Sequence, residues 1–340
     1  MSKTPVSFQS VTLPQKSSLP SLTREELLDV YEELCLTRRI EELAAKAYSI
    51  GKIKGFCHLY IGQESVAVGA ALATKQDYWI SAYREHIHAM VKGVSGRAMM
   101  AELFGKATGS VDGLGGSMHI FDKDCDFMGG WGIVGGHVPL ANGVGWAIQH
   151  RKEDRVCVCF FGDGAMHQGA FFEALCLAQL YKLPCIFICE NNGYAMGTSL
   201  ERQSAVTDLC RRADGVGMVN EQLLGFDVEH VRDRVAAARE FAVAGNGPVL
   251  LEIITYRYRG HSMSDPAKYR TKQEEKDHKE NHDPIQIVAN RLTNDFQATQ
   301  EELQHRKEKA DHEAQDAYDF ADQSPEPDVS KLYSYVYADN

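Results

Sequence analysis

Two continuous apolar runs joined by a helical pattern constrain the fold of this 340-residue chain more than any other feature. Val156–Phe161 and Cys185–Cys189 are apolar throughout, as is typical of strands that a parallel sheet buries on both faces. Between them, Ala170–Tyr181 carries apolar residues at helical spacing, and Pro184 ends that pattern. Val249–Thr255 is a further apolar run. The order of strand, helix and strand predicts an α/β protein with three layers, α/β/α, around a mainly parallel sheet.

The remainder of the chain predicts one large domain with an extension at each end. Residues 1–21 are rich in Ser and Pro, and we expect an extended N-terminal arm there. Thr23 and Glu26 have the spacing of a capping box, so a helix should begin the main domain, which we assign to residues 22–284. We interpret residues 285–340 as a C-terminal helical extension and tail that is largely solvated, because apolar positions are few.

Composition excludes several classes of function. The net charge of −11 argues against a nucleic-acid surface, which needs a basic stripe, and no apolar run is long enough to cross a bilayer. The first 20 residues have two lysines, no arginine and no long apolar stretch, so we expect neither a signal nor a transit peptide. The nine cysteines form no C-x-x-C, which favours reduced, buried thiols and a cytoplasmic protein.

Glycine is concentrated in one part of the chain. Twelve of the 29 glycines fall between Gly105 and Gly145, with His119 and Trp131 among them. Glycine lets a backbone adopt positive φ and approach a ligand closely, at an entropic cost. A linker would be more polar and less aromatic, so we interpret this segment as a loop system that lines a site.

The residues that follow the two apolar runs predict a metal site. Gly162-Asp163-Gly164 directly follows a buried run and opens a helix, which places backbone N–H groups where a phosphate can bind. Asn191-Asn192 ends the next run. Because the carboxyl ends of parallel strands meet at one edge of a sheet, Asp163 and Asn192 should lie side by side. Carboxylate and amide oxygens suit magnesium, and magnesium in turn suits a diphosphate.

Two other interpretations of these residues stay open. With Gly169, the glycines read G-x-G-x-x-x-x-G, which is close to a dinucleotide fingerprint but off its spacing. Glu190 could then serve as the acidic residue that binds a ribose. Alternatively, Asp163 caps a structural turn, and the asparagines are ordinary turn formers.

Longer strings around these positions resemble one family over about residues 22–284. They resemble the alpha subunits of the thiamin-diphosphate-dependent 2-oxo-acid dehydrogenases, and among these the first component of the pyruvate dehydrogenase complex. The strings are GDGAMHQG with ENNGYAMGTS within 162–199, FCHLYIGQE at 56–64, SAYREH at 81–86, GLGGSMHIF at 113–121, GIVGGHVPLANG at 132–143 and YRYRGHSMSDP at 256–266.

The resemblance implies an activity, cofactors and partners. It implies oxidative decarboxylation of pyruvate with reductive acetylation of lipoyl groups, and it implies thiamin diphosphate and Mg²⁺ as cofactors. It also implies an alpha2-beta2 heterotetramer whose beta subunit supplies the activating glutamate, and contact with the lipoyl domain of the dihydrolipoyl acetyltransferase component. Acetoin or branched-chain 2-oxo acids are alternative substrates. An NAD-dependent oxidoreductase of the Rossmann type is a more distant alternative, and a non-catalytic scaffold is a third.

The resemblance also implies how the metal and the diphosphate are bound. Asp163 and Asn192 would bind Mg²⁺ through their side chains, and Tyr194 through its carbonyl. Gly164 and Ala165 would contact the diphosphate through backbone groups.

Further residues are implied around the remainder of the cofactor. Tyr83, Arg84 and His261 would hold the phosphates, and Gly132 and Val134 would contact the aminopyrimidine. Phe56 and His58 would lie near the cofactor, with His58 facing pyruvate. The residues implied to be catalytic are His58, His261 and Arg84. We interpret Glu64, within the GQE string, as structural.

The chain departs from the family pattern near the metal loop. It has His167 where the family usually has Asn, and Ala195 where it usually has Gly. Ser199 and Ser262 match positions that are regulated in the family, but we interpret both as solvated loop serines.

Overall fold

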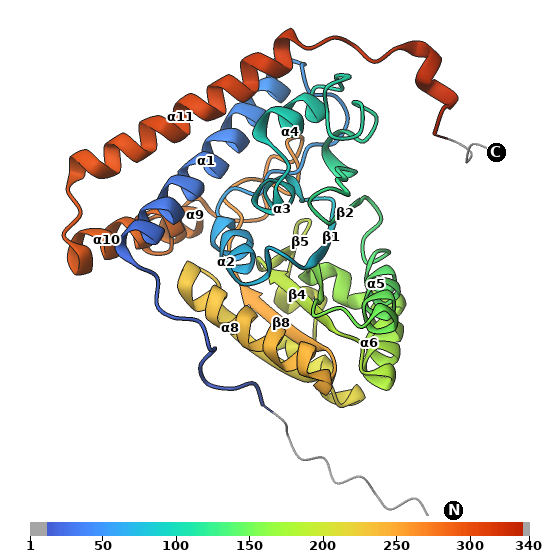
Figure 1. Cartoon of the computed structure of the whole chain (residues 1–340). Coiled ribbons are helices and arrows are strands. Elements are labelled where there is room, and N and C mark those ends of the chain that lie inside the picture. The colour runs from blue at the N-terminus through green and yellow to red at the C-terminus, as the bar shows by residue number, and fades with distance from the viewer. Residues whose placement is uncertain (1–11, 336–340) are drawn as a thin grey trace, which may run out of the picture.

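A six-stranded parallel sheet forms the centre of the molecule (Figure 1). The computed structural model describes residues 12–335. The strands lie in the order β2-β1-β3-β4-β8-β7, and a separate antiparallel pair, β5 and β6, follows β4 along the chain. Their bounds are β1 Tyr78–Ala82, β2 Phe127–Trp131, β3 Cys157–Gly162, β4 Cys185–Asn191, β5 Tyr194–Ala195, β6 Thr198–Ser199, β7 Val219–Leu224 and β8 Val249–Ile254.

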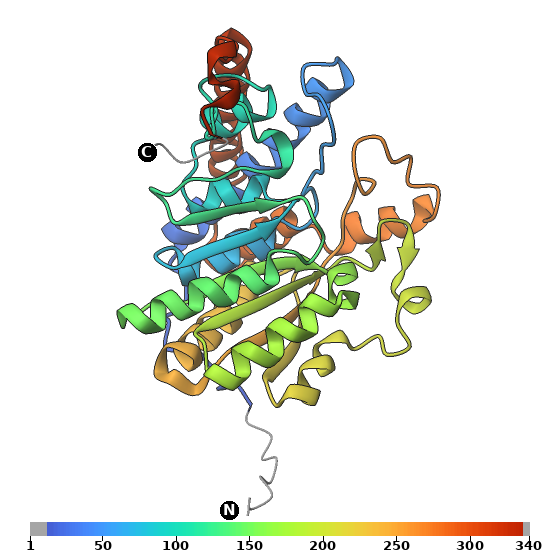
Figure 2. The ribbon, with the colours of Figure 1, turned by 90° about the vertical axis from the view of Figure 1, so that its right-hand side faces the viewer.

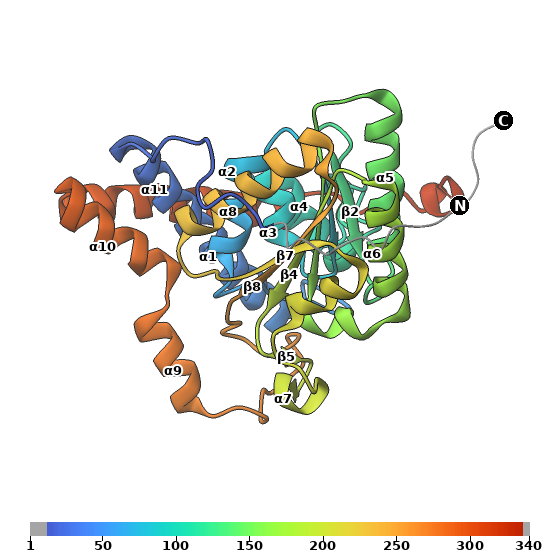
Figure 3. The same cartoon turned by 90° about the horizontal axis from the view of Figure 1, so that it is seen from below.

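Helices cover both faces of this sheet, so the predicted three-layer α/β/α fold is confirmed. Figures 1 and 3 show α5 and α6 on one side of the sheet, and α1, α2 and α8 on the other. The α-helices are α1 Arg24–Ser49, α2 Glu64–Thr74, α3 His86–Lys92, α4 Gly96–Leu103, α5 Val138–Arg151, α6 Gly169–Tyr181, α7 Leu200–Gln203, α8 Val228–Phe241, α9 Lys272–Asn281, α10 Pro284–Phe296 and α11 Gln300–Gln323.

Strand β3 illustrates why the central strands lack polar residues. Val158 and Phe160 belong to the core cluster on the α1, α2 and α8 side. Cys157, Cys159 and Phe161 belong to the cluster on the α5 and α6 side. Successive side chains of a strand point to opposite faces, so a strand that is covered on both sides must be apolar at every position.

The glycine-rich stretch is more regular than expected. Edge strand β2 lies within it, and α5 begins at Val138, so the prediction of loops throughout Gly105–Gly145 is wrong for these two elements. Residues 105–126 do run mostly as turns and loops. Buried Glu102 holds that loop, because its carboxylate accepts hydrogen bonds from the backbone N–H groups of Val111, Gly113, Gly115 and Gly116.

The two long terminal helices pack along each other, as Figure 1 shows. The capping box at Thr23 and Glu26 is present and begins α1 at Arg24. Helix α11 buries a stripe of small residues, Ala310, Ala314, Ala317 and Ala321, together with Leu303 and Tyr318. The interpretation of this region as solvated is therefore wrong for the inner face of α11. Alanine at helical spacing adds little to apolar composition, yet it lets two helices approach closely.

The N-terminal arm can be followed only from residue 12, since residues 1–11 lie outside the described part. Residues 12–21 contain no helix or strand and pass over α8. There Arg234 donates to the carbonyl of Pro14, and the Ser18 backbone N–H donates to Glu240.

Within residues 12–335, no helix combines the length and apolar character needed to span a bilayer.

Long connections gather beyond the carboxyl ends of the strands. The segment from β5 to α7 and the loop that leads from β8 into α9 project together on that side of the molecule (Figures 2 and 3). Parallel α/β sheets bind ligands at this edge, and the candidate site lies there.

Candidate active site

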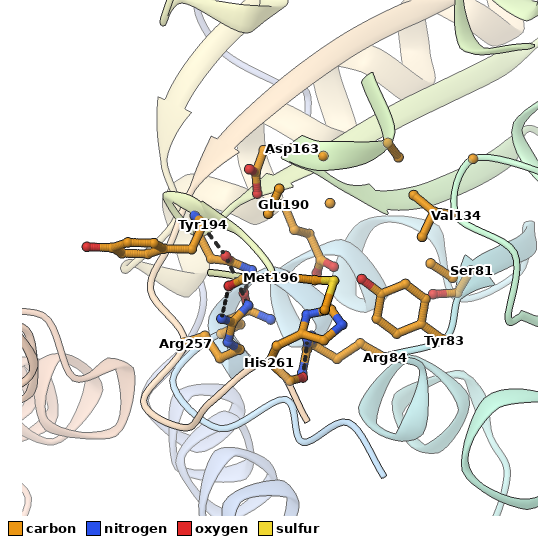
Figure 4. A pocket seen from close by; sticks show the side chains of 18 of the residues that line it. Ser81, Tyr83, Arg84, Val134, Asp163, Glu190, Tyr194, Met196, Arg257 and His261 are labelled. Atoms are coloured by element: carbon orange, nitrogen blue, oxygen red, sulfur yellow. Dashed lines mark hydrogen bonds between the residues drawn. The ribbon is translucent and has the colours of Figure 1, made fainter. Parts of the chain in front are cut away.

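A cavity of about 300 Å³ lies at the carboxyl ends of β1, β3 and β4 (Figure 4). Nine of the residues that sequence analysis assigned to a cofactor line this cavity: Tyr83, Arg84, Val134, Asp163, Gly164, Ala165, Asn192, Tyr194 and His261. They come from five separate segments of the chain, so the fold brings together residues that are far apart in sequence.

Asp163 and Asn192 both line the cavity, as the strand-end argument predicts. Asp163 follows β3 and is 1% exposed, and Gln203 donates a hydrogen bond to its Oδ2 at 2.5 Å. Burial raises the pKa of the Asp163 carboxyl, because the charged form loses water, and the Gln203 donor opposes this rise. Within residues 12–335 no basic side chain forms an ion pair with Asp163. A bound cation would supply the missing positive charge.

The two consecutive asparagines have different roles. Asn191 is turned into the protein, where its Nδ2 donates to Glu252 and its Oδ1 accepts from the backbone N–H of Gly193. Asn192 faces the cavity, and its Nδ2 donates to Gln63 Oε1 at 3.0 Å. This contact leaves Asn192 Oδ1 on the other side of the amide, where it accepts only long hydrogen bonds of 3.3–3.4 Å. That oxygen is therefore available to a metal ion.

Two buried arginines add positive charge to the same cavity. Arg84 Nη1 donates to the carbonyl of Leu59 at 2.6 Å, and Arg84 Nη2 donates to the carbonyl of His261 at 2.9 Å. Arg257 is 2% exposed, and its donors reach Asn192 Oδ1, the Met196 carbonyl and the Tyr269 hydroxyl. Burial and the neighbouring Arg257 lower the pKa of Arg84 to about 10.

In the described part of the chain neither arginine pairs with a carboxylate within 4.0 Å. Burying an unpaired cation is costly, and two together are tolerated best where an anion binds. The sequence analysis did not single out Arg257. Residues that follow parallel strands meet at one edge of the sheet, and this rule, which predicted the position of Asn192, also applies to Arg257. Arg257 comes three residues after the end of β8.

Position 164 requires glycine because Ala195, in the segment that follows β4, lies very close to it. A Cβ added at this position would lie 2.8 Å from the Cβ of Ala195. Ala195 is one of the two departures from the family pattern, and its methyl group is the atom that approaches. The other departure, His167, lies next to Arg212 at the edge of the same region.

A second cavity of about 560 Å³ adjoins the first and opens outward. The two share Tyr83, Val134, Met196 and His261. The second contains the remaining predicted residues, Phe56, His58 and Gly132. The structure therefore brings all twelve predicted site residues to one continuous space.

The two histidines that face this space are held as neutral rings. Their ring centroids lie 5.1 Å apart, and Tyr83 packs against both. Burial, with Arg84 nearby, lowers the pKa of His58 to about 2 and that of His261 to about 3. The Nδ1 atom of His58 is buried and has no hydrogen-bond partner among the described residues.

The loop that carries His261 is fixed by its own side chains. Asp265 Oδ2 accepts from the His261 backbone N–H at 2.6 Å and from the Tyr269 hydroxyl at 2.7 Å. Tyr269 in turn accepts from Arg257 at 2.9 Å. Ser262 lies on the same loop and contacts Ser264, whereas Ser199 is the residue before α7.

Two acidic residues near the cavity have structural partners. Glu190 accepts from the hydroxyl of Tyr60 and contacts His88 Nε2 at 3.0 Å. Its position at the strand end agrees with the dinucleotide alternative, but these contacts hold it in the interior, where it is 6% exposed. Glu64 pairs with Arg38 and accepts from the backbone of Gly62, so it is structural as expected.

These residues fit a magnesium diphosphate. The Asp163 carboxylate and the Asn192 amide oxygen are the hard oxygen donors that Mg²⁺ prefers. Arg84 and Arg257 match the charge of phosphate oxygens. Because Gly164 carries no Cβ, backbone groups can approach a ligand at the end of β3.

Comparison with known proteins points in the same direction. Residues 32–330 match the model of the family described as dehydrogenase E1 component. The pyruvate dehydrogenase E1 component subunit alpha of Rhizobium meliloti (strain 1021) is 48% identical over 320 residues, which are 94% of this chain and 92% of the relative. The protein of the same name from Zymomonas mobilis is 46% identical over 92% of this chain and 89% of its own length. That from Porphyra purpurea is 40% identical over 97% of this chain and 100% of its own.

Proposed function

The chain belongs to the dehydrogenase E1 component family, and from this premise we propose that it is the alpha subunit of a pyruvate dehydrogenase that uses thiamin diphosphate and Mg²⁺. One observation carries the proposal beyond the family. A single cavity contains the oxygens of Asp163 and Asn192 together with two buried arginines that have no carboxylate partner among the described residues. This combination suits a metal-bound diphosphate.

The proposed contacts follow from this geometry. Asp163 and Asn192 bind Mg²⁺ through side-chain oxygens, with Tyr194 contributing its carbonyl. Arg84 and Arg257, which line the same cavity, neutralise the charge of the diphosphate. When bound, thiamin diphosphate supplies the carbon that attacks the ketone of the 2-oxo acid and the ring that accepts the electrons left when carbon dioxide departs.

The remaining residues bind and orient the substrate. His58 and His261 are neutral, so each can donate one hydrogen bond and accept another without placing a further positive charge beside the arginines. We propose that His58 faces pyruvate and that His261, which lines both cavities, contacts the phosphates. Gly132 and Val134 also line the outer cavity, where their backbone can contact the aminopyrimidine.

A partner chain is part of the proposal, because the cofactor also needs a carboxylic acid beside its pyrimidine ring. Three described carboxylates line the two cavities: Asp163, Glu190 and Asp265. Asp163 faces the metal, and the other two are engaged with structural partners. We therefore assign the activating glutamate to a beta subunit.

A large exposed apolar surface supports such a partner. Helices α5 and α6 pack on each other, and their outer sides expose apolar residues. We call this surface the α5–α6 face; it consists of Leu140, Trp146, Phe172, Leu177, Leu180 and Tyr181. Contiguous apolar surface of this kind marks a protein interface. We propose an alpha2-beta2 heterotetramer, with a lipoyl domain reaching the outer cavity.

The free cysteines are consistent with a cytoplasmic location. All nine are unpaired with one another, and seven of them are buried in the core: Cys35, Cys57, Cys157, Cys159, Cys185, Cys189 and Cys210. A reducing compartment keeps such thiols free.

The cofactor assignment can be tested by calorimetric titration of the purified complex. We expect thiamin diphosphate to bind when Mg²⁺ is present and to stop binding when EDTA removes the metal. Binding of NAD that is indifferent to EDTA would instead support the dinucleotide alternative.

The substrate can be tested by co-expressing the chain with candidate beta subunits. The complex would be assayed with pyruvate, acetoin and branched-chain 2-oxo acids and an artificial electron acceptor. We expect the highest kcat/KM for pyruvate, and a higher value for acetoin or a branched substrate would replace it.

A further inference from the structure

The backbone beside His58 is held at three consecutive residues by side chains from elsewhere. The His58 N–H donates to Ser117 Oγ at 3.4 Å. The Leu59 carbonyl accepts from Arg84 at 2.6 Å, and the Tyr60 N–H donates to Glu41 Oε1 at 2.9 Å. Such complete anchoring of a loop backbone fixes where the His58 ring can lie.

Two of these anchors are joined by a histidine. His86 Nδ1 lies 3.1 Å from Glu41 Oε2, and His86 Nε2 lies 2.8 Å from Ser117 Oγ. Glu41, His86 and Ser117 are 0%, 0% and 4% exposed. They come from α1, from the start of α3 and from the short helix at Gly116–Met118. We call the contacts that join Glu41, His86 and Ser117 the line; it connects three distant segments.

The chemistry of these groups orients the hydrogen bonds in one direction. A carboxylate only accepts, so His86 carries a proton on Nδ1. In the neutral ring Nε2 then has a lone pair, and its shorter contact, at 2.8 Å, is with the Ser117 hydroxyl rather than with the Ser117 backbone carbonyl at 3.2 Å. The Ser117 hydroxyl must then donate to Nε2, which leaves its own oxygen to accept the N–H of His58. The line therefore runs from the His58 backbone through Ser117 and His86 to Glu41.

A carboxylate, a histidine and a serine in this order also occur where serine acts as a nucleophile. That role does not fit here. Ser117 lines neither cavity and is almost completely buried, and its hydroxyl is engaged both as donor and as acceptor. The arrangement can hold a group in place but cannot reach a substrate.

The His58 ring has little else to hold it. Its Nδ1 has no hydrogen-bond partner among residues 12–335, and its contacts are ring packing against Tyr83, His261 and Phe56. We propose that Glu41, His86 and Ser117 are positioning residues that set the location of the His58 imidazole for the reaction. The inference rests on the proposed function, in that His58 is the residue that meets the substrate.

The test compares two serines of one loop in the assembled complex. Ser117→Ala removes the hydroxyl that links His58 to His86. Ser110→Ala is the matched control, because the buried Ser110 hydroxyl has no hydrogen-bond partner among the described residues. Glu41→Gln tests the direction of the line, since an amide can donate to His86 Nδ1 and favour the other tautomer.

We expect Ser117→Ala to lower kcat by about 10-fold to 100-fold, the cost of a small misplacement of a reacting group. KM for pyruvate should change less than about 3-fold, and the affinity for thiamin diphosphate, measured by calorimetry, should stay within about 2-fold. Glu41→Gln should resemble Ser117→Ala, and Ser110→Ala should resemble wild type. A crystal structure of Ser117→Ala should show the His58 ring displaced.

Two results would overturn the proposal. One is a Ser117→Ala complex with wild-type kcat and an unmoved His58 ring. The other is a loss of cofactor affinity or of melting temperature that matches the loss of kcat, because the network would then be only a scaffold. If the wild-type complex turns over no 2-oxo acid, the proposed function fails, and the position of the His58 ring alone decides the inference.

Discussion

The inner and outer ends of the candidate site differ in how completely this chain forms them. At the inner end, Asp163, Asn192, Arg84 and Arg257 are buried, and hydrogen bonds orient each of them. At the outer end, large apolar side chains are exposed: Phe56 is 64% exposed and Ile133 is 78% exposed. The inner end is polar, and its side chains are buried and hydrogen-bonded. The outer end is apolar and exposed to solvent.

This difference indicates which functions each end can carry by itself. Buried, oriented polar groups form a binding site for a charged ligand without help from another chain. Exposed apolar residues next to a cavity are typical of a surface that another protein covers. We infer that this chain holds the cofactor and that a partner completes the chemistry.

The largest effect is expected from removing the metal ligand at the inner end. Asp163→Ala takes away the carboxylate that binds Mg²⁺, and the diphosphate loses its cation. We expect thiamin diphosphate affinity to fall by at least about 100-fold, more than for the loss of an outer-shell contact. Calorimetry measures this affinity. Glu64→Gln is not a suitable control, because Glu64 pairs with Arg38 and its loss would disturb the structure. Unchanged affinity would place the metal elsewhere.

A smaller effect is expected from removing one cation at the same end. Arg84→Met keeps the apolar stem and deletes the guanidinium that has no carboxylate partner in the described part of the chain. A hydrogen bond to a charged group contributes about 1.5–3 kcal/mol, so affinity should fall by roughly 10-fold to 150-fold. The free energy of unfolding without cofactor should change by less, because an unpaired buried charge is also removed. A variant that loses stability but keeps affinity would make Arg84 structural.

A charge on the α5–α6 face, none of whose residues lines either cavity, should act on assembly alone. Trp146→Glu places a carboxylate on an exposed apolar surface, and we expect affinity for the beta subunit to fall by about 10-fold or more. Gln300→Glu, at the exposed start of α11, is the control. Analytical ultracentrifugation of co-expressed chains measures assembly. Normal assembly of Trp146→Glu would place the partner on another surface.

The last effect is expected in the pH dependence of stability. The pKa of His58 is lowered to about 2 in the folded chain, well below the ordinary value of 6.5. The unfolded chain therefore binds a proton that the folded chain excludes, so this contribution to stability is complete above pH 6.5 and is lost as the pH falls toward 2. Replacing His58 by Gln should flatten the fall in unfolding free energy by up to about 1.4 kcal/mol per pH unit between pH 6 and 4. Urea unfolding at several pH values measures this, and parallel curves for the two chains would contradict a neutral, buried His58.

The layered fold could be predicted because the central strands are apolar at every position. Val156–Phe161 and Cys185–Cys189 have no polar residue, and the structure extends them only to Gly162 and Asn191. Strand β2 was not predictable in this way, since its sequence is Phe-Met-Gly-Gly-Trp and glycine disfavours strands. Its pairing with β1 overrides that local preference. The buried face of α11 was missed because its contacts are made by alanines.

The candidate site could be predicted where residues directly follow buried strands. Asp163 and Asn192 do so, and strand order alone brings them together. Glu41 and His86 could not be found from the sequence, because their relation depends on how α1 packs against α3. The other ten positions implied by resemblance meet in the cavities, but the sequence itself contains no spacing rule that would place them there.

The most direct test of the whole account is pyruvate turnover with an artificial electron acceptor, in the presence of thiamin diphosphate and Mg²⁺, by the chain alone and by the chain co-expressed with a beta subunit. The account predicts turnover by the assembled complex and none above background by the chain alone, because the activating acid belongs to the partner. Full turnover by the chain alone would contradict it.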